Sequence, residues 1–133
     1  SEMCIRDSLI TPTKKKLTPN QLSTGLFAWK VVKHTKSNAI VVAKNNKIIS
    51  ISGGQTSRVD ATKIAFEKTK IPKGCIVASD AFFPFKDSIE KMAQYNIAAI
   101  IQPGGSIRDK EVVESCNKNK IAMAFTGFRV FKH

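Results

Sequence analysis

The sequence predicts a three-layer α/β/α domain on a mixed, mostly parallel β-sheet. Three observations lead to this fold class: short apolar segments of strand type recur along the chain, segments of helical type separate them, and the connections between them are short. Alternation of strands and helices with short turns is typical of a parallel sheet covered by helices. The chain has 133 residues, which suits a single domain of this kind.

The first predicted element is a helix from Thr18 to about His34. Thr18 is an N-cap residue followed by a proline at the first helical position, and Gln21 completes a capping box. The residues before this helix are polar and lysine-rich and lack any periodicity. We therefore expect an irregular tail over residues 1–17 and one domain over residues 18–133.

An antiparallel hairpin follows. Residues 38–44 are β-branched and apolar, Asn45-Asn46 is a turn signal, and residues 47–51 can return as the second strand. Further along, Ser57 and Asp60 predict the start of a helix that ends near Lys70. The elements expected after it are strands over 75–78, 97–101 and 121–125 and helices over 87–94 and 106–118.

The segment SDAFFPFKD, residues 79–87, leaves the end of the predicted 75–78 strand. Ligands bind outside the carboxyl ends of parallel strands, so Phe82, Phe83 and Phe85 are expected on the rim of a binding site. An aromatic face there can stack on a flat heterocycle. The alternative is that these side chains fill a sheet edge or a subunit interface, and we expect at least one of them to be structural.

Two predicted strand-to-helix corners carry the same residue types, SGGQTSRVD from Ser52 and PGGSIRD from Pro103. Glycines let a backbone approach a ligand, and helix N-termini offer N–H groups to anions. Ordinary corner chemistry, with glycine for the bend and serine for the cap, explains these weak patterns better. Dinucleotide-binding and P-loop motifs are not found in the sequence.

The formal net charge of +12 favours anionic partners, among them nucleic acid, nucleotides and polyglutamylated cofactors. A basic nucleic-acid-binding module would need basic residues interleaved with exposed aromatic residues on one face. A dimerisation module without a ligand is a further alternative.

The cysteine spacing argues against a disulfide framework and a zinc site, because Cys4, Cys75 and Cys116 are scattered. We expect Cys75 and Cys116 to be small buried thiols. The sequence contains neither an apolar run of the ~20 residues that a membrane span requires nor a signal-peptide pattern. These features predict a cytoplasmic protein without a membrane partner.

Five segments together resemble one family, in the family's order: KSNAIVVAKNN, SGGQTSRVDATKIA, SDAFFPFKDSIE, IIQPGGSIRDKEVV and GFRVFKH. The family is that of the bifunctional purine biosynthesis proteins, which carry AICAR transformylase and IMP cyclohydrolase. The resemblance covers about residues 9–133 and matches the C-terminal part of the transformylase region. It implies a cytidine-deaminase-like subdomain without zinc. The opening SEMCIRDS does not fit, which indicates that residues 1–8 are foreign sequence.

The resemblance also implies an activity in IMP biosynthesis. The family transfers a formyl group from 10-formyltetrahydrofolate, its cosubstrate, to the 5-amino group of AICAR. We expect these two ligands and a homodimeric full-length enzyme as partners, and no nucleic acid. The family's catalytic Lys-His pair and the cyclohydrolase domain lie outside the matched region, so the fragment alone is expected to be inactive.

Four residues fall at the family's catalytic and AICAR positions. Asn38 in KSNA matches an asparagine near the reacting amine and carboxamide. Arg129, Phe131 and His133 in FRVFKH match residues that shape the AICAR pocket, with Arg129 facing the phosphate and His133 catalytic. From the residues alone, Asn38 could equally be a turn-forming residue ahead of a strand, and His133 a disordered chain end.

Three residues fall at the family's folate positions, namely Arg58 in QTSR and Phe82 and Asp87 in DAFFPFKD. Phe82 would lie against the pterin, and Asp87 would accept hydrogen bonds from its ring nitrogens. Asp87 could instead be only an N-cap residue. Some family members bind potassium near KSNA and SDAFF, although Ala39 stands where the family has a serine ligand.

Overall fold

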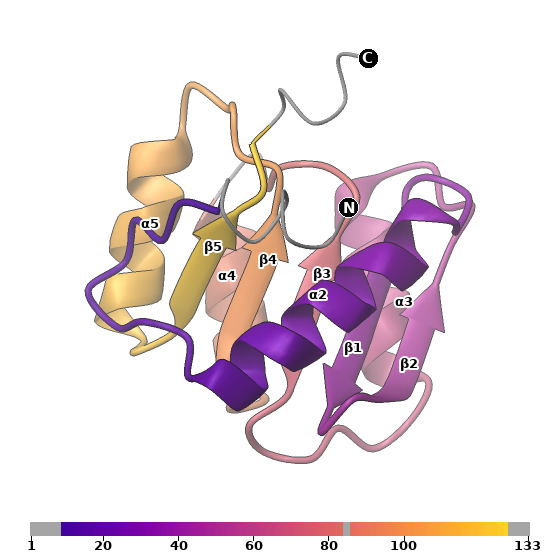
Figure 1. Ribbon diagram of the computed structural model, residues 1–133. Coiled ribbons are helices and arrows are strands. Elements are labelled where there is room, and N and C mark those ends of the chain that lie inside the picture. The colour runs from indigo at the N-terminus through magenta and orange to yellow at the C-terminus, as the bar shows by residue number, and fades with distance from the viewer. Residues whose placement is uncertain (1–8, 84–85, 128–133) are drawn as a thin grey trace.

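The computed structural model describes residues 9–83 and 86–127. Within them, one five-stranded sheet has the strand order β2-β1-β3-β4-β5 (Figure 1). The strands are β1 (Ile40–Lys44), β2 (Lys47–Ser52), β3 (Ile76–Ser79), β4 (Ala99–Gln102) and β5 (Ala122–Phe125). The helices are α2 (Pro19–Lys33), α3 (Arg58–Glu67), α4 (Lys86–Ala93) and α5 (Asp109–Lys118).

The strand directions bring four carboxyl ends to one edge of the sheet. β1 is antiparallel to both of its neighbours, β2 and β3, whereas β3, β4 and β5 are parallel. β2 therefore points the same way as β3, β4 and β5, and only β1 begins where the others end. Ile40 at the start of β1 pairs with Ser52 on one side and Ser79 on the other. The predicted mixed, mostly parallel sheet is confirmed, and we call this edge the carboxyl edge.

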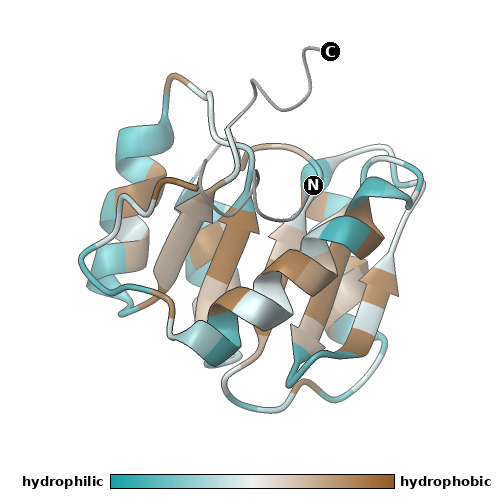
Figure 2. Cartoon of the chain, viewed as in Figure 1, coloured by the Kyte–Doolittle hydropathy of each residue, from teal (hydrophilic) through white to brown (hydrophobic). Residues whose placement is uncertain are grey.

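Helices cover both faces of the sheet, as the predicted three-layer architecture requires (Figure 1). On one face, α2 packs on Val41 and Ala43. On the other, α3, α4 and α5 share a core with Ile40 and Val42. Alternate residues of β1 thus serve opposite layers, which explains why the strand reads as a continuous apolar run. Figure 2 shows the hydrophobic residues concentrated on the strands and the hydrophilic ones on turns and outer helix surfaces.

Local signals account for the first elements. The hydroxyl of Thr18 accepts a hydrogen bond from the Gln21 backbone N–H, and the Gln21 side chain accepts one from the Thr18 N–H, which confirms the predicted capping box. Asn45 and Asn46 have φ values of 51° and 59°, the left-handed conformation that a tight two-residue hairpin turn requires. Asparagine tolerates this conformation better than most residues, so the turn type follows from the sequence.

Residues 9–17 form an irregular segment that packs against the free edge of β5, and we call it the β5 strap. Ile10 and Phe125 exchange backbone hydrogen bonds of 3.0 and 2.7 Å. The hydroxyl of Thr13, which is 1% exposed, accepts a 2.9 Å hydrogen bond from the Met123 backbone N–H. The strap therefore satisfies backbone groups that an edge strand would otherwise leave open. The strap has an irregular course and is packed against the domain.

Candidate functional site

The carboxyl edge gathers polar residues from three separate parts of the chain. Asn38 lies directly before β1, Arg58 follows β2 as the first residue of α3, and Asp80 directly follows β3. Because β1 runs against its neighbours, its beginning lies beside the ends of β2 and β3. The sheet topology thus brings together two predicted site residues, Asn38 and Arg58.

Arg58 is the centre of a hydrogen-bonded network. Its Nη1 donates to the Asp80 carboxylate at 2.6 Å and to the Ala39 carbonyl at 3.0 Å, and its Nη2 donates to Asn38 Oδ1 at 2.9 Å. The side chains of Arg58 and Asp80 are only 8% and 11% exposed. A buried charge is tolerated when it is paired and hydrogen-bonded, and both conditions hold here.

The side chain of Asn38 is held at both ends. Its Oδ1 accepts from Arg58, and its Nδ2 donates to the backbone carbonyl of Gln55 at 3.1 Å. The backbone N–H of Asn38 also donates to the Gln55 carbonyl at 3.0 Å. Asn38 does precede a strand, but long-range contacts rather than a local turn fix its amide.

Asp80 is a site residue that sequence reasoning missed. Its carboxylate accepts hydrogen bonds from Arg58, from the Ala39 backbone N–H at 3.2 Å and from the Ser37 hydroxyl. The signal was present, because Asp80 comes directly after a buried strand in the segment SDAFF. Its importance depends on a partner 22 positions away in the chain, which no local pattern reveals.

The contacts of Asp80 bear on the potassium ion that some family members bind near the segments KSNA and SDAFF, a site made doubtful here by Ala39. Both carboxylate oxygens already accept hydrogen bonds, and the Arg58 guanidinium lies 2.6 Å from one of them. Ala39 supplies no side-chain oxygen. A cation at this point would meet a neighbouring positive charge and a carboxylate that is already engaged. The arrangement therefore does not fit a potassium ion at Asp80.

The corner between β4 and α5 has residue types similar to those of the corner between β2 and α3, which carries Arg58, but its side chains are arranged differently. Arg108 forms a 2.8 Å ion pair with Glu111 in the same segment, and these side chains are 49% and 45% exposed. The Asp109 carboxylate accepts from the backbone N–H groups of Gly105 and Ser106 at 2.8 and 3.2 Å. The helix begins at Asp109 rather than at the expected Ser106, because the carboxylate binds back onto the glycine turn.

The phenylalanines after β3 have different environments. Phe83 is fully buried within the core on the α3–α5 side, and its backbone N–H donates to the Gln102 side chain at 3.2 Å. The expectation that Phe83 stands on a binding rim is therefore wrong, and Phe83 is the structural residue expected among the three. Phe82 is 41% exposed and remains available to a ligand. Phe85 lies outside the described residues.

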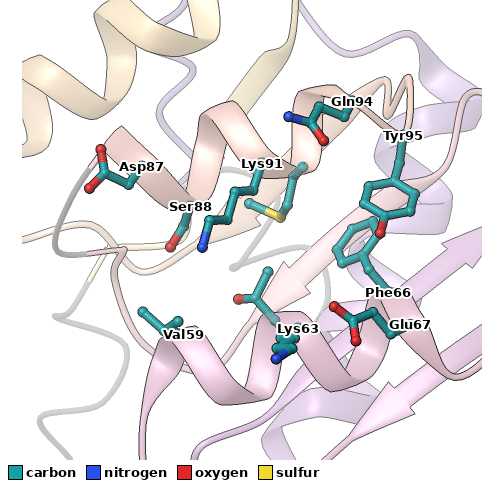
Figure 3. A pocket seen from close by; sticks show the side chains of 11 residues that line it. Val59, Lys63, Phe66, Glu67, Asp87, Ser88, Lys91, Gln94 and Tyr95 are labelled. Atoms are coloured by element: carbon teal, nitrogen blue, oxygen red, sulfur yellow. The ribbon is translucent and has the colours of Figure 1, made fainter.

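Asp87 lies at a pocket of about 450 Å³ between α3 and α4 (Figure 3). In Figure 3, Asp87 and Val59 lie toward one end of the pocket, and Phe66 and Tyr95 lie at the other. Val59 directly follows Arg58 in the first turn of α3, but Arg58 itself does not line the pocket. The remaining lining residues are Thr62, Lys63, Glu67, Ser88, Lys91, Met92 and Gln94.

Asp87 itself sits in the first turn of α4, which begins at Lys86. The helix dipole stabilises a carboxylate at this position. This placement is inside the helix rather than at the N-cap that the sequence also allowed. It leaves the carboxylate on the lining of the pocket.

The two cysteines within the described ranges are buried, as expected. Burial raises the pKa of the Cys116 thiol to about 12. Burial also raises the pKa of Cys75, although the nearby Lys44 partly offsets the effect. Since the thiolate is the reactive form, both residues behave as inert core side chains.

The remaining predicted residues, Arg129, Phe131 and His133, lie outside the described residues. In residues 9–83 and 86–127, no group of three or more His, Cys, Asp or Glu side chains could hold a metal ion. No helix in that same part of the chain is long and apolar enough to cross a membrane.

Comparison with known proteins identifies the family. The sequence model of a family described as "AICARFT/IMPCHase bienzyme" matches residues 2–68. The bifunctional purine biosynthesis protein PurH of Aquifex aeolicus is 55% identical over 131 residues, which is 96% of this chain and 26% of that protein. The protein of the same name from Acetivibrio thermocellus is 54% identical over 134 residues, which is 100% of this chain and 26% of that protein. The one from Persephonella marina is 52% identical over 125 residues, which is 91% of this chain and 24% of that protein.

The chain spans about a quarter of the length of these relatives. The match to them nevertheless extends over nearly all of this chain's own residues. On this basis the chain belongs to the AICARFT/IMPCHase bienzyme family.

Proposed function

We propose that this chain is the C-terminal part of the transformylase region of a bifunctional purine biosynthesis protein. In that role it contributes residues that bind AICAR and 10-formyltetrahydrofolate during formyl transfer to the AICAR amine. The observation that carries the proposal is the direct contact between Asn38 and Arg58 at the carboxyl edge. These residues come from two separate motifs that resemble the family, and the fold places them in one network.

Asn38 is proposed to act beside the reacting amine and carboxamide of AICAR. An asparagine amide donates and accepts hydrogen bonds at once, which suits recognition of a carboxamide or stabilisation of a developing oxyanion. Its contacts with Arg58 and Gln55 hold the amide in one orientation before a ligand arrives. Such preorganisation lowers the reorganisation required in the transition state.

The folate is proposed to bind at the α3–α4 pocket, beside the first turn of α3 that carries Arg58. Asp87 would accept hydrogen bonds from pterin ring nitrogens, and Phe82 would supply an aromatic face. The pocket volume of about 450 Å³ suits part of a ligand of this size. Lys63 and Lys91 also line the pocket, and their charges suit the carboxylates of the glutamate tail.

Arg58 is proposed to contribute to the folate side of the site. It donates three hydrogen bonds within the described residues, and a guanidinium carries further N–H groups. By the family resemblance, Arg129, Phe131 and His133 complete the AICAR pocket. The full-length enzyme is proposed to be a cytoplasmic homodimer, with its catalytic Lys-His pair and its cyclohydrolase domain outside this chain.

A chimera tests this function. The segment of the Aquifex aeolicus protein that matches this chain is replaced by residues 9–133, and AICAR formylation is measured with 10-formyltetrahydrofolate. The chimera is expected to formylate AICAR, whereas the isolated chain is expected to show no turnover, because the acid–base pair lies elsewhere. An inactive chimera, with the parent enzyme active in parallel, would contradict the proposal. Turnover by the isolated chain would contradict the assignment of essential chemistry to the missing part.

A further inference from the structure

We infer that Asp80 is a positioning residue for formyl transfer, which acts through Arg58 on the side-chain amide of Asn38. The inference rests on the proposed function, in which Asn38 lies beside the reacting amine. It adds Asp80, which directly follows β3, to Asn38 and Arg58, two of the residues that the family resemblance assigns to the site.

Arg58 links Asp80 to Asn38, because its guanidinium donates a hydrogen bond to each of them. The Asp80 carboxylate accepts a 2.6 Å hydrogen bond from Arg58 Nη1, and Arg58 Nη2 donates to Asn38 Oδ1 at 2.9 Å. Asp80 also accepts from the Ala39 backbone N–H at 3.2 Å, which ties it to the residue that follows Asn38. The guanidinium is planar and rigid, so fixing one of its nitrogens fixes the direction of the other.

The chemistry of the partners decides which way the Asn38 amide points. A guanidinium only donates hydrogen bonds, so Arg58 selects the oxygen of the amide. The Gln55 carbonyl only accepts, so it selects the nitrogen. If Arg58 moves away, the Gln55 carbonyl still holds the amide nitrogen, but the amide oxygen loses its donor and the amide is no longer fixed at both ends.

Asp80 is the charged group that holds Arg58 in this place. The other two acceptors of the guanidinium, the Ala39 carbonyl and Asn38 Oδ1, are neutral. Charge-assisted hydrogen bonds are roughly twice as strong as neutral ones. Loss of the Asp80 charge therefore removes the strongest contact of a side chain that is 8% exposed.

A purely structural role for Asp80 is the competing explanation, because a buried ion pair also affects folding. The two roles differ in what they change. A positioning residue alters kcat while the KM values for both substrates stay close to those of the parent, since the Asn38 amide matters most in the transition state. A structural residue alters the melting temperature and leaves the kcat of the folded fraction unchanged.

The test uses Asp80→Asn in the active chimera, with Asn38→Ala and the double variant beside it. We expect Asp80→Asn to lower kcat by about tenfold to a hundredfold, the size seen when a supporting contact of a functional group is removed. In the Asn38→Ala background, Asp80→Asn should cause no further loss, because the group on which it acts is gone. Asp109→Asn is the matched control, since Asp109 also accepts backbone hydrogen bonds at a corner of this edge without contacting Asn38.

A second variant covers a failure to fold. Asp80→Glu keeps the charge but displaces the carboxylate by one methylene, and we expect it to lower kcat by at least about threefold with full recovery of folded protein. An unchanged kcat for Asp80→Asn would overturn this inference but not the proposed function. The same would follow if Asp80→Asn lowered kcat by the same factor in the chimera and in its Asn38→Ala variant. Should Asp80→Asn not fold, an unchanged kcat for Asp80→Glu would overturn it. A chimera that lacks formylation without any substitution contradicts the proposed function and, with it, this inference.

Discussion

The β2–α3 corner and the β4–α5 corner have similar sequences and different environments. In the first, Arg58 turns inward and pairs with Asp80, which directly follows β3. In the second, Arg108 pairs with Glu111 of its own segment at a surface position. The first corner lies where β1 enters the sheet against the direction of its neighbours. The place of a corner in the sheet, rather than its residue types, therefore decides whether its arginine joins a site.

The largest expected effect is on stability. Arg58→Ala leaves the buried Asp80 carboxylate without its cation, and this should cost about 3–5 kcal/mol in the free energy of unfolding. Arg108→Ala breaks an exposed ion pair and should change that free energy by no more than ~0.5 kcal/mol. Urea unfolding of the two variants measures the difference. Equal losses would show that the two corners are energetically alike.

The pocket beside the first corner offers a functional comparison. Asp87→Asn keeps the size of the side chain but loses its charge and one acceptor group. A charged hydrogen bond contributes ~1.5–3 kcal/mol, so the folate KM of the chimera should rise by about one to two powers of ten. The AICAR KM and the melting temperature should barely change. An unchanged folate KM, together with a lower melting temperature for Asp87→Ala, would make Asp87 only a helix residue.

The sequence predicted the fold where local signals decide the structure. The Thr18 capping box and the Asn45-Asn46 turn each depend on neighbouring residues, and both are present. The site was predictable only in part, because Asn38 and Arg58 came from motif resemblance. The role of Asp80 and the burial of Phe83 depend on long-range contacts with Arg58 and Gln102. Those contacts can be predicted only once the strand order is known.

The β5 side of the sheet should be structural rather than functional. Thr13→Val keeps the shape but leaves the buried Met123 N–H without its acceptor, which should cost about 1–3 kcal/mol. The kcat of the chimera should not change. Lys15→Ala, at an exposed position of the same strap, is the control and should have little effect on stability. A loss of kcat in folded Thr13→Val would extend the functional region to the strap.

An effect confined to alkaline pH is a dependence of stability on pH from Cys116 in α5. Its pKa is about 12 in the folded chain against 9.0 as the reference value, so folding favours the protonated thiol. The stability from this group is complete below pH 9 and is lost as the pH rises from 9 toward 12. In this range the free energy of unfolding of Cys116→Ala should fall less steeply than that of the parent. Parallel pH dependences would show that Cys116 does not contribute.

The most direct measurement compares Arg58→Lys with Arg108→Lys in the chimera. Lysine keeps the positive charge at both corners but cannot contact Asp80, Ala39 and Asn38 at once as the guanidinium does. We expect kcat/KM for AICAR formylation to fall at least about tenfold for Arg58→Lys and to stay within about twofold of the parent for Arg108→Lys. Equal values for the two variants would contradict the claim that the network at the first corner belongs to the site.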